Sequence, residues 1–579
     1  MKKKIKIIII IAALMLTCTT ISSVSAADGD INAYGVPLKS TFNGGNSADN
    51  MTINGNKMAV DNNGSVYIVG HTNSPNLPTT PGAYQTTLSS PSSSNTDVFI
   101  TKYSNDQSQL LACTYLGGLG NDFGNSIAIG NNGNVYVTGY TDSLSGLTSP
   151  GGFPVATGAF DTTKGGTKEA FVAMFDPSLS QLLACTFLGG GGDDYGNDIT
   201  IDDDDNIYVT GKTDSTDFAA AFSDEYGTGY QNTPGPGFVV KLDPMLSTLS
   251  AGTYFNGTSY AIAMGNDGSV YITGRTSLST GFATDGAYDT SRGGQNDAFI
   301  ARLNSSLNQL FACTYFGGSG SNDDAYDIVV GNDNNVYITG ISNSNDLPTT
   351  TGAYDNTRGG SSDAYIAKLN SSLSELLACT YFGGSTIETG YNIVVGSDGS
   401  IYVTGITNSN DLPTTTGAYD NTYNGGQDAF IACFNNSLST LNYSTYYGGS
   451  GDDYGYALTF TGQDAFAMGG YTSSADLPVN GMLIGNPVDN SFNGGTDLFM
   501  SLWFFGSEFK VPTAQFTADI TSREAPLTAH FTDKSSNFPT SWSWDFNNDG
   551  KIDSTQQNPV WVYNTPGTYT VKLTVSFTV

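Results

Sequence analysis

Oxygen-bearing side chains near the C-terminus have the spacing of a calcium-binding loop. They are Asp545, Asn547, Asp549 and Asp553. Oxygen ligands at alternate positions can wrap around a hard cation, and Gly550 permits the sharp turn that such a loop needs. Position twelve is Gln556 instead of the bidentate glutamate of an EF-hand. Calcium is therefore the one candidate cofactor, and a polar turn between two strands is the alternative.

Paired carboxylates recur along the chain, each pair just after a glycine-rich turn. The pairs are Asp193–Asp194, Asp323–Asp324 and Asp452–Asp453, and Asp202 to Asp205 form a run of four. Such groups could bind calcium or the hydroxyl groups of a sugar. Aspartate also caps turns and keeps an acidic surface hydrated. Because turn chemistry alone accounts for aspartate at these places, a structural role is the favoured interpretation.

Tyrosine recurs at one position of the long loops whose sequences are variants of LPTTTGAY. The residues are Tyr84, Tyr288, Tyr354 and Tyr419. Aromatic rings can stack on glycans or anchor a partner. Their regular recurrence favours a different role, in which each ring packs its loop onto its own sheet. The loop tips, such as Asn421 to Asp428, are then the better candidates for contact.

Catalytic motifs are absent from the sequence, and we expect no enzymatic activity. The chain has two histidines, His71 and His530, in different predicted domains, and it has no nucleophile elbow, HExxH motif or P-loop. The alternative is a carbohydrate-active enzyme, a glycosidase or lyase that uses paired carboxylates. Its predicted place is the segment from Asp217 to Gln231, with Asp217 and Asp224, because this segment breaks the repeat described next.

The phrase VYITG, or a close variant, returns seven times along the chain. The copies start at Val66, Val135, Ile207, Val270, Val336, Ile401 and, in degraded form, Ala465. Successive copies lie 63 to 72 residues apart, and a period of this kind indicates a repeat architecture. Each copy is one of four short runs rich in Val, Ile, Tyr, Thr and Phe, bounded by turn residues. Such runs predict four antiparallel strands in each repeat.

Four-stranded sheets packed face to face describe a β-propeller, here with seven blades. The seventh repeat ends after its third strand, at Asp497–Trp503, and Val36–Gly45 carries the missing fourth-strand pattern. We therefore expect the N-terminal strand to complete the last sheet and close the ring, which leaves no open ladder at the join. A solenoid, the other repeat architecture, would need capping repeats.

The repeat motifs resemble the seven-bladed propeller repeats called SBBP. The matching motifs are GGGGDDYGNDITIDDDDNIYVTGKT at Gly189–Thr213, LPTTPGAY at Leu77–Tyr84, LLACTYLGG at Leu110–Gly118 and GGQDAFIA at Gly425–Ala432. The resemblance covers about Val36 to Gly506. It implies an extracellular or surface protein of a family whose members mostly have no assigned activity.

The C-terminal residues resemble a PKD domain, a small immunoglobulin-like β-sandwich. The resemblance depends on Trp542-Ser-Trp544-Asp545-Phe546 and on the run from Tyr563 to Val571. It implies a spacer or adhesion module. The predicted domains are thus a propeller over residues 33–506, a linker over 507–511 and a PKD domain over 512–579.

The first 26 residues are typical of a signal peptide. Lysines at positions 2, 3, 4 and 6 precede an apolar run from Ile7 to Leu16, and small residues end at Ala26, where we expect cleavage. No other apolar stretch is long enough to span a membrane. The sequence therefore predicts export to the extracellular space or the cell surface.

The composition restricts the partners. The net charge is −32, and it becomes −36 without the four lysines of the leader. Nucleic acid is excluded as a partner because phosphate binding needs clustered basic residues. Four cysteines occupy the same position in different repeats, and such positions are expected to lie too far apart for a disulfide. We therefore interpret these cysteines as small buried residues. They are Cys113, Cys185, Cys313 and Cys379.

The sequence predicts an all-β, secreted or cell-surface protein that binds the cell envelope or forms part of it. Its propeller loops would contact envelope glycans or surface proteins in adhesion, and the PKD domain would act as a spacer. A purely structural surface-layer component is a further alternative.

Overall fold

The computed structural model describes residues 4–11, 35–52, 55–89, 95–146, 151–218, 235–462, 465–479, 488–505, 514–520, 522–535, 539 and 541–576. Over these residues the chain is all-β and contains no α-helix. No helix in this part of the chain is long and apolar enough to cross a membrane. The chain divides into two compact units, of which the larger comprises Ser40–Asn480 and Pro487–Trp503.

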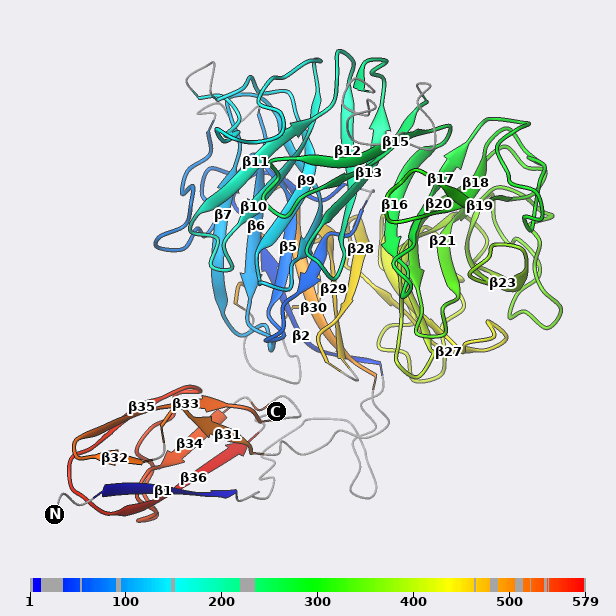
Figure 1. Ribbon diagram of the computed structural model, residues 1–579. Coiled ribbons are helices and arrows are strands. Elements are labelled where there is room, and N and C mark those ends of the chain that lie inside the picture. The colour runs from blue at the N-terminus through cyan, green and yellow to red at the C-terminus, as the bar shows by residue number, and fades with distance from the viewer. Residues whose placement is uncertain are drawn as a thin grey trace. The chain divides into compact units, whose positions relative to one another are not determined.

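The larger unit is a series of antiparallel sheets, most of them four-stranded, and all but the last are built from strands consecutive in the chain (Figure 1). The first sheet comprises β3 (Asp49–Asn50), β4 (Met58–Val60), β5 (Val66–Thr72), β6 (Asp97–Tyr103) and β7 (Leu110–Leu116). The second comprises β8 (Asp122–Ile129), β9 (Val135–Thr141), β10 (Glu169–Phe175) and β11 (Leu182–Leu188). The third comprises β12 (Asp194–Ile201), β13 (Ile207–Thr213), β14 (Gly237–Leu242) and β15 (Leu249–Phe255).

The later sheets repeat this pattern. The fourth comprises β16 (Thr258–Met264), β17 (Val270–Thr276), β18 (Asp297–Leu303) and β19 (Leu310–Phe316). The fifth comprises β20 (Asp323–Val330), β21 (Val336–Ser342), β22 (Asp363–Leu369) and β23 (Leu376–Phe382). The sixth comprises β24 (Glu388–Val395), β25 (Ile401–Thr407), β26 (Asp428–Phe434) and β27 (Leu441–Tyr447). The last comprises β28 (Asp453–Phe460), β29 (Ala465–Thr472), β30 (Asp497–Phe504) and β2 (Val36–Asn43).

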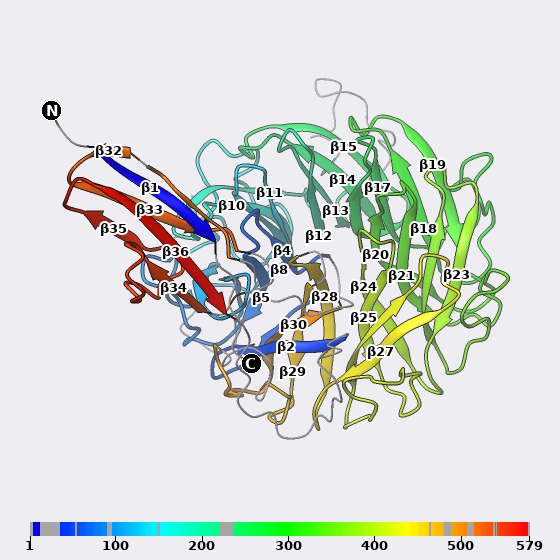
Figure 2. The same ribbon diagram turned by 90° about the horizontal axis from the view of Figure 1, so that it is seen from below.

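The sheets form a closed circuit in which the first strand of each sheet faces the middle (Figure 2). Strands β8, β12, β16, β20, β24 and β28 contact one another in this order, and β4 contacts both β28 and β8. The strand β2 lies beside β30, where Ser40 Oγ donates to Met500 O at 3.3 Å, so the N-terminal strand completes the last sheet as the sequence predicted. Repeated four-stranded antiparallel sheets in this order are consistent with a β-propeller.

The tyrosine, threonine and glycine of the VYITG motif each have a structural role. In the fifth sheet the Tyr337 ring lies 5.1 Å from the Lys368 ammonium, and its hydroxyl donates to Asp333 at 2.8 Å. Thr339 Oγ1 donates to Tyr365 O at 2.8 Å, which ties the second strand to the third. A Cβ atom on Gly340 would overlap the carbonyl oxygen of Asp324 in the first strand. Glycine is therefore required where the first and second strands come closest.

The cysteines of the repeat are buried and free, as expected. Cys113, Cys185, Cys313 and Cys379 are each 0% exposed and lie within the hydrophobic clusters between neighbouring sheets. Burial raises the pKa of the Cys113 thiol to about 12, so it stays protonated and unreactive.

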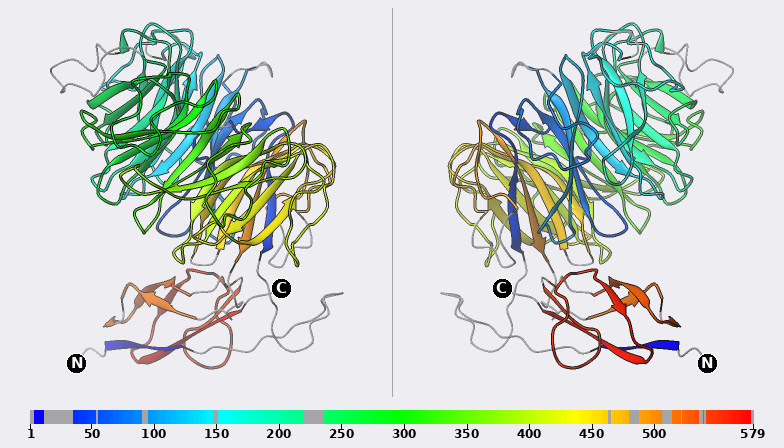
Figure 3. Two further views of the ribbon diagram at one scale, coloured as in Figure 1. Left: turned by 90° about the vertical axis from the view of Figure 1, so that its right-hand side faces the viewer. Right: turned by 90° about the vertical axis from the view of Figure 1, so that its left-hand side faces the viewer.

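The second unit contains two sheets that enclose one core (Figure 3). One sheet has the order β32 (Ser522–Glu524), β1 (Lys4–Ile11), β36 (Thr568–Ser576), β34 (Ser541–Asp545), and the other has the order β31 (Phe516–Ala518), β33 (Leu527–Asp533), β35 (Val560–Tyr563). Trp544 is fully buried in the core, and its Nε1 donates to Gln556 O at 2.8 Å. The strand β1 belongs to the segment for which a signal peptide is predicted, and its cleavage stays a prediction. Residues 12–34 and the predicted linker at 507–511 lie outside the described residues.

Candidate binding site

The four residues of the predicted calcium loop do lie in one loop. Their oxygens accept hydrogen bonds from the backbone of that loop: Asp545 Oδ2 from Gly550 N at 2.8 Å, and Asp553 Oδ2 from Phe546 N at 2.8 Å. Asn547 Oδ1 accepts from Asp549 N at 3.0 Å. Within the described ranges, no group of three or more His, Cys, Asp or Glu side chains is placed to hold a metal ion. The geometry shows a turn closed by its own side chains, and calcium at this loop stays a prediction.

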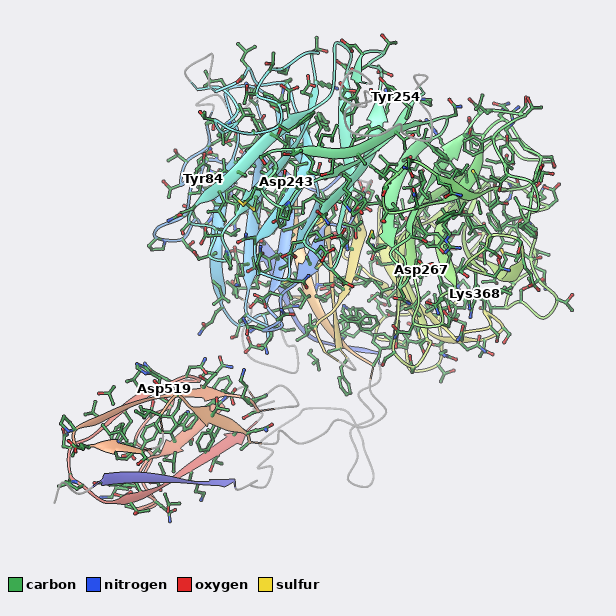
Figure 4. All side chains as sticks on the ribbon, viewed as in Figure 1. Tyr84, Asp243, Tyr254, Asp267, Lys368 and Asp519 are labelled. Atoms are coloured by element: carbon green, nitrogen blue, oxygen red, sulfur yellow. The ribbon has the colours of Figure 1, made fainter. Side chains whose placement is uncertain are left out.

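Three of the loop tyrosines pack against the neighbouring sheet, and Tyr419 also contacts Tyr447 in its own sheet. The Tyr84 ring centroid lies 5.6 Å from that of Phe175 in the second sheet (Figure 4). Tyr354 lies 5.8 Å from Phe434, and Tyr419 lies 5.8 Å from Trp503, each again in the next sheet. These rings therefore join consecutive sheets.

Asp217 lies at the start of the segment predicted for an enzymatic site. Its Oδ1 accepts from Gly191 N at 2.7 Å, which is a turn contact. Residues 219–234, which include Asp224, lie outside the described residues.

The structure brings together a set of residues that sequence reasoning missed, at bulges in the first strands. In six sheets the pairing between the first and second strands shifts by one residue, for example between Ala325 and Asp327. A bulge of this kind leaves one residue unpaired and turns its side chain aside. The bulged residues are Asn125, Asn197, Tyr260, Tyr326, Tyr391 and Tyr456.

The two asparagines lie in the second and third sheets, and the four tyrosines lie in the fourth sheet to the last. The bulged residues thus form two arcs of the circuit. Asn125 Nδ2 donates to Gly196 O at 2.8 Å, and Asn197 Nδ2 donates to Ser259 O at 2.7 Å, so the asparagines link neighbouring first strands. The tyrosine rings contact one another from sheet to sheet. The centroid separations are 5.6 Å for Tyr260–Tyr326, 5.6 Å for Tyr326–Tyr391 and 4.8 Å for Tyr391–Tyr456.

Further aromatic rings lie on both arcs. Tyr454 lies 4.4 Å from Tyr471 in the last sheet. Tyr140 lies 4.6 Å from Phe123 and 4.8 Å from Tyr195 in the second and third sheets. We call the whole set the aromatic belt: Phe123, Tyr140, Tyr195, Tyr260, Tyr326, Tyr391, Tyr454, Tyr456 and Tyr471. Most of its rings are partly exposed, and only Tyr260 and Tyr456 are buried, at 8% and 5% exposed.

Cations lie over the belt although the chain is strongly acidic. The Lys168 ammonium lies 5.2 Å from the Tyr195 centroid, and the Lys212 ammonium lies at the same distance. The Arg275 guanidinium lies 6.0 Å from the Tyr260 centroid and 3.7 Å from the Asp324 carboxylate. The side chains of Lys212 and Arg275 are 39% and 46% exposed, so solvent and a ligand can reach them.

A cluster of buried ionisable residues lies beside the bulges and links the first strands of different sheets. Lys57 is fully buried and donates to Asn125 O. Asp198 accepts from Ser126 Oγ at 2.7 Å and from Ile262 N at 2.8 Å, and Asp327 accepts from Ile393 N at 2.8 Å. Burial lowers the pKa of Lys57, and it raises the pKa of both carboxyls. These residues position the belt and are too buried to contact a ligand themselves.

Comparisons with known proteins agree with both resemblances seen in the sequence. The β-propeller repeat model (SBBP) matches residues 47–78, 113–144 and 185–219, and the PKD domain model matches residues 510–578. Domains of both kinds are typical of extracellular proteins. No curated protein matches the chain.

Solved structures give distant likenesses. A chain of the mitotic checkpoint complex is 8% identical with a TM-score of 0.42, over 85% of this chain and 98% of that chain. A protein of unknown function from Dyadobacter fermentans DSM 18053 is 9% identical with a TM-score of 0.37, over 81% and 98%. The polysaccharide lyase PL25 ulvan lyase bound to -[GlcA(1-4)Rha3S]- is 10% identical with a TM-score of 0.38, over 82% and 96%. At these TM-scores the likenesses support no function for this chain.

Proposed function

We propose that the chain is a non-catalytic extracellular binding protein, and that its aromatic belt binds a glycan of the cell envelope. The proposed architecture is a seven-bladed β-propeller closed by β2, followed by an immunoglobulin-like sandwich that acts as a spacer. The closed circuit of sheets and the two sheets around Trp544 support these two assignments.

The observation that carries the proposal is two groups of contacting, mostly partly exposed rings, with cations over Tyr140, Tyr195 and Tyr260. The flat face of an aromatic ring binds the C–H face of a sugar, and its edge and hydroxyl bind polar groups. Lys212 and Arg275 already pair with Asp214 and Asp324, and the exposed parts of their side chains could bind sugar hydroxyls or a uronate carboxylate. Burial and the neighbouring Tyr454 raise the pKa of Tyr391 to about 12, so its hydroxyl stays protonated and can donate.

A glycan array followed by calorimetric titration tests the proposal. We expect Tyr195→Ala and Tyr391→Ala each to weaken binding at least tenfold, which corresponds to a loss of about 1.4 kcal/mol. Phe311→Ala is the matched control, since Phe311 is 46% exposed but lies outside the belt. Equal binding by all three variants would place the ligand elsewhere, for example on the loop tips around Asn421.

Incubating the purified chain with the glycans of the array tests the alternative of a carbohydrate-active enzyme. New reducing ends or unsaturated uronates formed by the purified chain would establish turnover and contradict the non-catalytic part of the proposal. Glycan binding without product, together with loss of binding in the belt variants, supports it.

A further inference from the structure

Six buried carboxylate pairs recur where consecutive sheets meet. In each pair one carboxylate begins the third strand of a sheet, and the other begins the first strand of the next sheet. The pairs are Asp97–Asp122, Glu169–Asp194, Asp297–Asp323, Asp363–Glu388, Asp428–Asp453 and Asp497–Asp49. Each of these side chains is at most 1% exposed. The doublets seen in the sequence are thus split, since Asp453 is buried in such a pair whereas Asp452 accepts from Gln427 N in a loop.

In the two pairs that flank the last sheet, the member from the first strand has hydrogen-bond partners on both of its carboxylate oxygens. Asp453 Oδ2 accepts from Gly449 N and from Ser474 Oγ, both at 2.7 Å, and Asp453 Oδ1 accepts from Thr472 Oγ1. Asp49 has the same partners in the first sheet, namely Gly45 N, Ser74 Oγ and Thr72 Oγ1.

The member from the third strand differs between pairs. Asp363 accepts from Gly360 N with Oδ1 at 3.0 Å and from Gly359 N with Oδ2 at 2.8 Å. Asp428 and Asp497 use Oδ2 only, for Asn424 N at 3.0 Å and Asn493 N at 2.7 Å. The Oδ1 atoms of Asp428 and Asp497 have no hydrogen-bond partner. The same holds for Asp97 Oδ1 and Glu169 Oε1, but Lys164 interacts electrostatically with both of those pairs, through Asp122 and Glu169.

Each unpartnered oxygen faces the partner carboxylate across a glycine. The point that a Cβ atom on Gly448 would occupy lies 2.7 Å from Asp428 Oδ1 and 2.9 Å from Asp453 Oδ2. The corresponding point on Gly44 lies 2.5 Å from Asp497 Oδ1 and 2.8 Å from Asp49 Oδ2. Two buried carboxylates therefore direct oxygens to one small space that only glycine leaves open.

Protein cations reach other pairs but not these two. The Arg358 charge lowers the pKa of Asp363, although burial raises it overall, and Lys164 interacts electrostatically with Glu169 and Asp122. These cations stand five residues before the third-strand carboxylate of their sheets. The equivalent positions before Asp428 and Asp497 are Tyr423 and Phe492.

We propose that Asp428–Asp453 and Asp497–Asp49 each bind a divalent cation, Ca²⁺, at the seams on either side of the last sheet. The donors are hard oxygens, and Ca²⁺ accepts carboxylates with hydroxyl, carbonyl and water oxygens in a flexible shell. A divalent ion also neutralises two charges that the protein leaves uncompensated. The inference is independent of the glycan site.

Metal content and thermal stability of the full chain test this proposal. After treatment with EDTA and titration with Ca²⁺, we expect saturable binding and a rise in Tm. Tb³⁺ should replace Ca²⁺ and show luminescence sensitised by Tyr423, whose pKa is raised in part by Asp428. The variants Asp428→Asn and Asp497→Asn should each bind one ion fewer.

Three comparisons decide the outcome. Asp363→Asn is the matched control, because Arg358 serves that pair, and it should leave the ion count unchanged. Asp545→Asn removes a ligand of the C-terminal loop, so loss of all Ca²⁺ binding in this variant would overturn the proposal. If the two carboxyls of a pair share a proton instead, Asp428→Asn should be as stable as the wild type. Ca²⁺ should then leave the Tm of the wild type unchanged. If a seam variant fails to fold, the Ca²⁺ that Asp545→Asn still binds decides the matter.

Discussion

Asp428 and Asp363 occupy the same position in neighbouring sheets but differ in their electrostatic surroundings. Burial, with the facing Asp453 carboxylate, raises the pKa of Asp428 to about 7. Burial, with the facing Asp49 carboxylate, raises the pKa of Asp497 to about 7. The pKa of Asp49 rises to about 6 through burial alone, against its hydrogen bonds to Thr72, Gly45 and Ser74. Burial therefore keeps these aspartates protonated to a higher pH than an ordinary aspartate.

These raised pKa values give the propeller unit a pH dependence of stability. A carboxyl whose pKa is higher in the folded state binds more protons there than in the unfolded chain, so stability falls as the pH rises between the two values. In EDTA we therefore expect Tm to fall as the pH rises from about 5 to 8, past the folded values near 6 and 7. Calorimetry at fixed ionic strength measures this, and saturating Ca²⁺ should flatten the curve. A Tm in EDTA that rises over this range would contradict the assignment.

At the residue scale, sequence reasoning could identify repeated aspartates but not their burial. Asp452 and Asp453 are adjacent and chemically identical, yet only Asp453 begins a strand and is enclosed. The missing signal was the spacing to Thr472 and Ser474, which recurs in other sheets as Asp122 with Thr141 and Ser143.

The strands were predictable because most repeats contain the same four strand patterns in the same order. The bulges were not predictable, because these strands are buried on both faces and lack the alternation whose phase an extra residue would shift. The aromatic belt depends on these bulges, and Tyr391 and Asn197 occupy equivalent bulges with different side chains. A comparison of the repeats at this position would have singled out the tyrosines.

The glycine of the VYITG motif is the element-scale feature that is most open to test. A Cβ atom on Gly405 would overlap the carbonyl oxygen of Thr389, beside the bulge at Tyr391. We expect Gly405→Ala to lower the free energy of unfolding by about 1–3 kcal/mol, because a tightly packed site must move apart. Gly495→Ala is the control, since no atom lies within 4 Å of its Cβ position. Equal denaturation midpoints for the two variants would show that the strands can separate at no cost.

At the scale of the whole molecule, the circuit of sheets depends on a strand from the opposite end of the chain. Without β2, the strand β30 would present an open edge, and open edges invite pairing with other chains. We expect deletion of residues 36–43 to lower Tm and to produce dimers or larger species in size-exclusion chromatography. A synthetic peptide of this sequence should restore the monomer. A monomeric deletion variant with unchanged Tm would show that β2 is dispensable.

The hydrogen bond from Ser40 to Met500 joins residues 460 positions apart. Folding of the circuit therefore cannot finish while the chain is being synthesised or threaded through a channel, because the closing strand must wait for the last sheet to emerge. Such long-range pairing makes folding slow, and it leaves open strand edges exposed in the meantime. The same topology slows disassembly, since no sheet can leave the circuit from a free end. Resistance to proteases outside the cell would then reflect a high barrier to opening more than a large equilibrium stability.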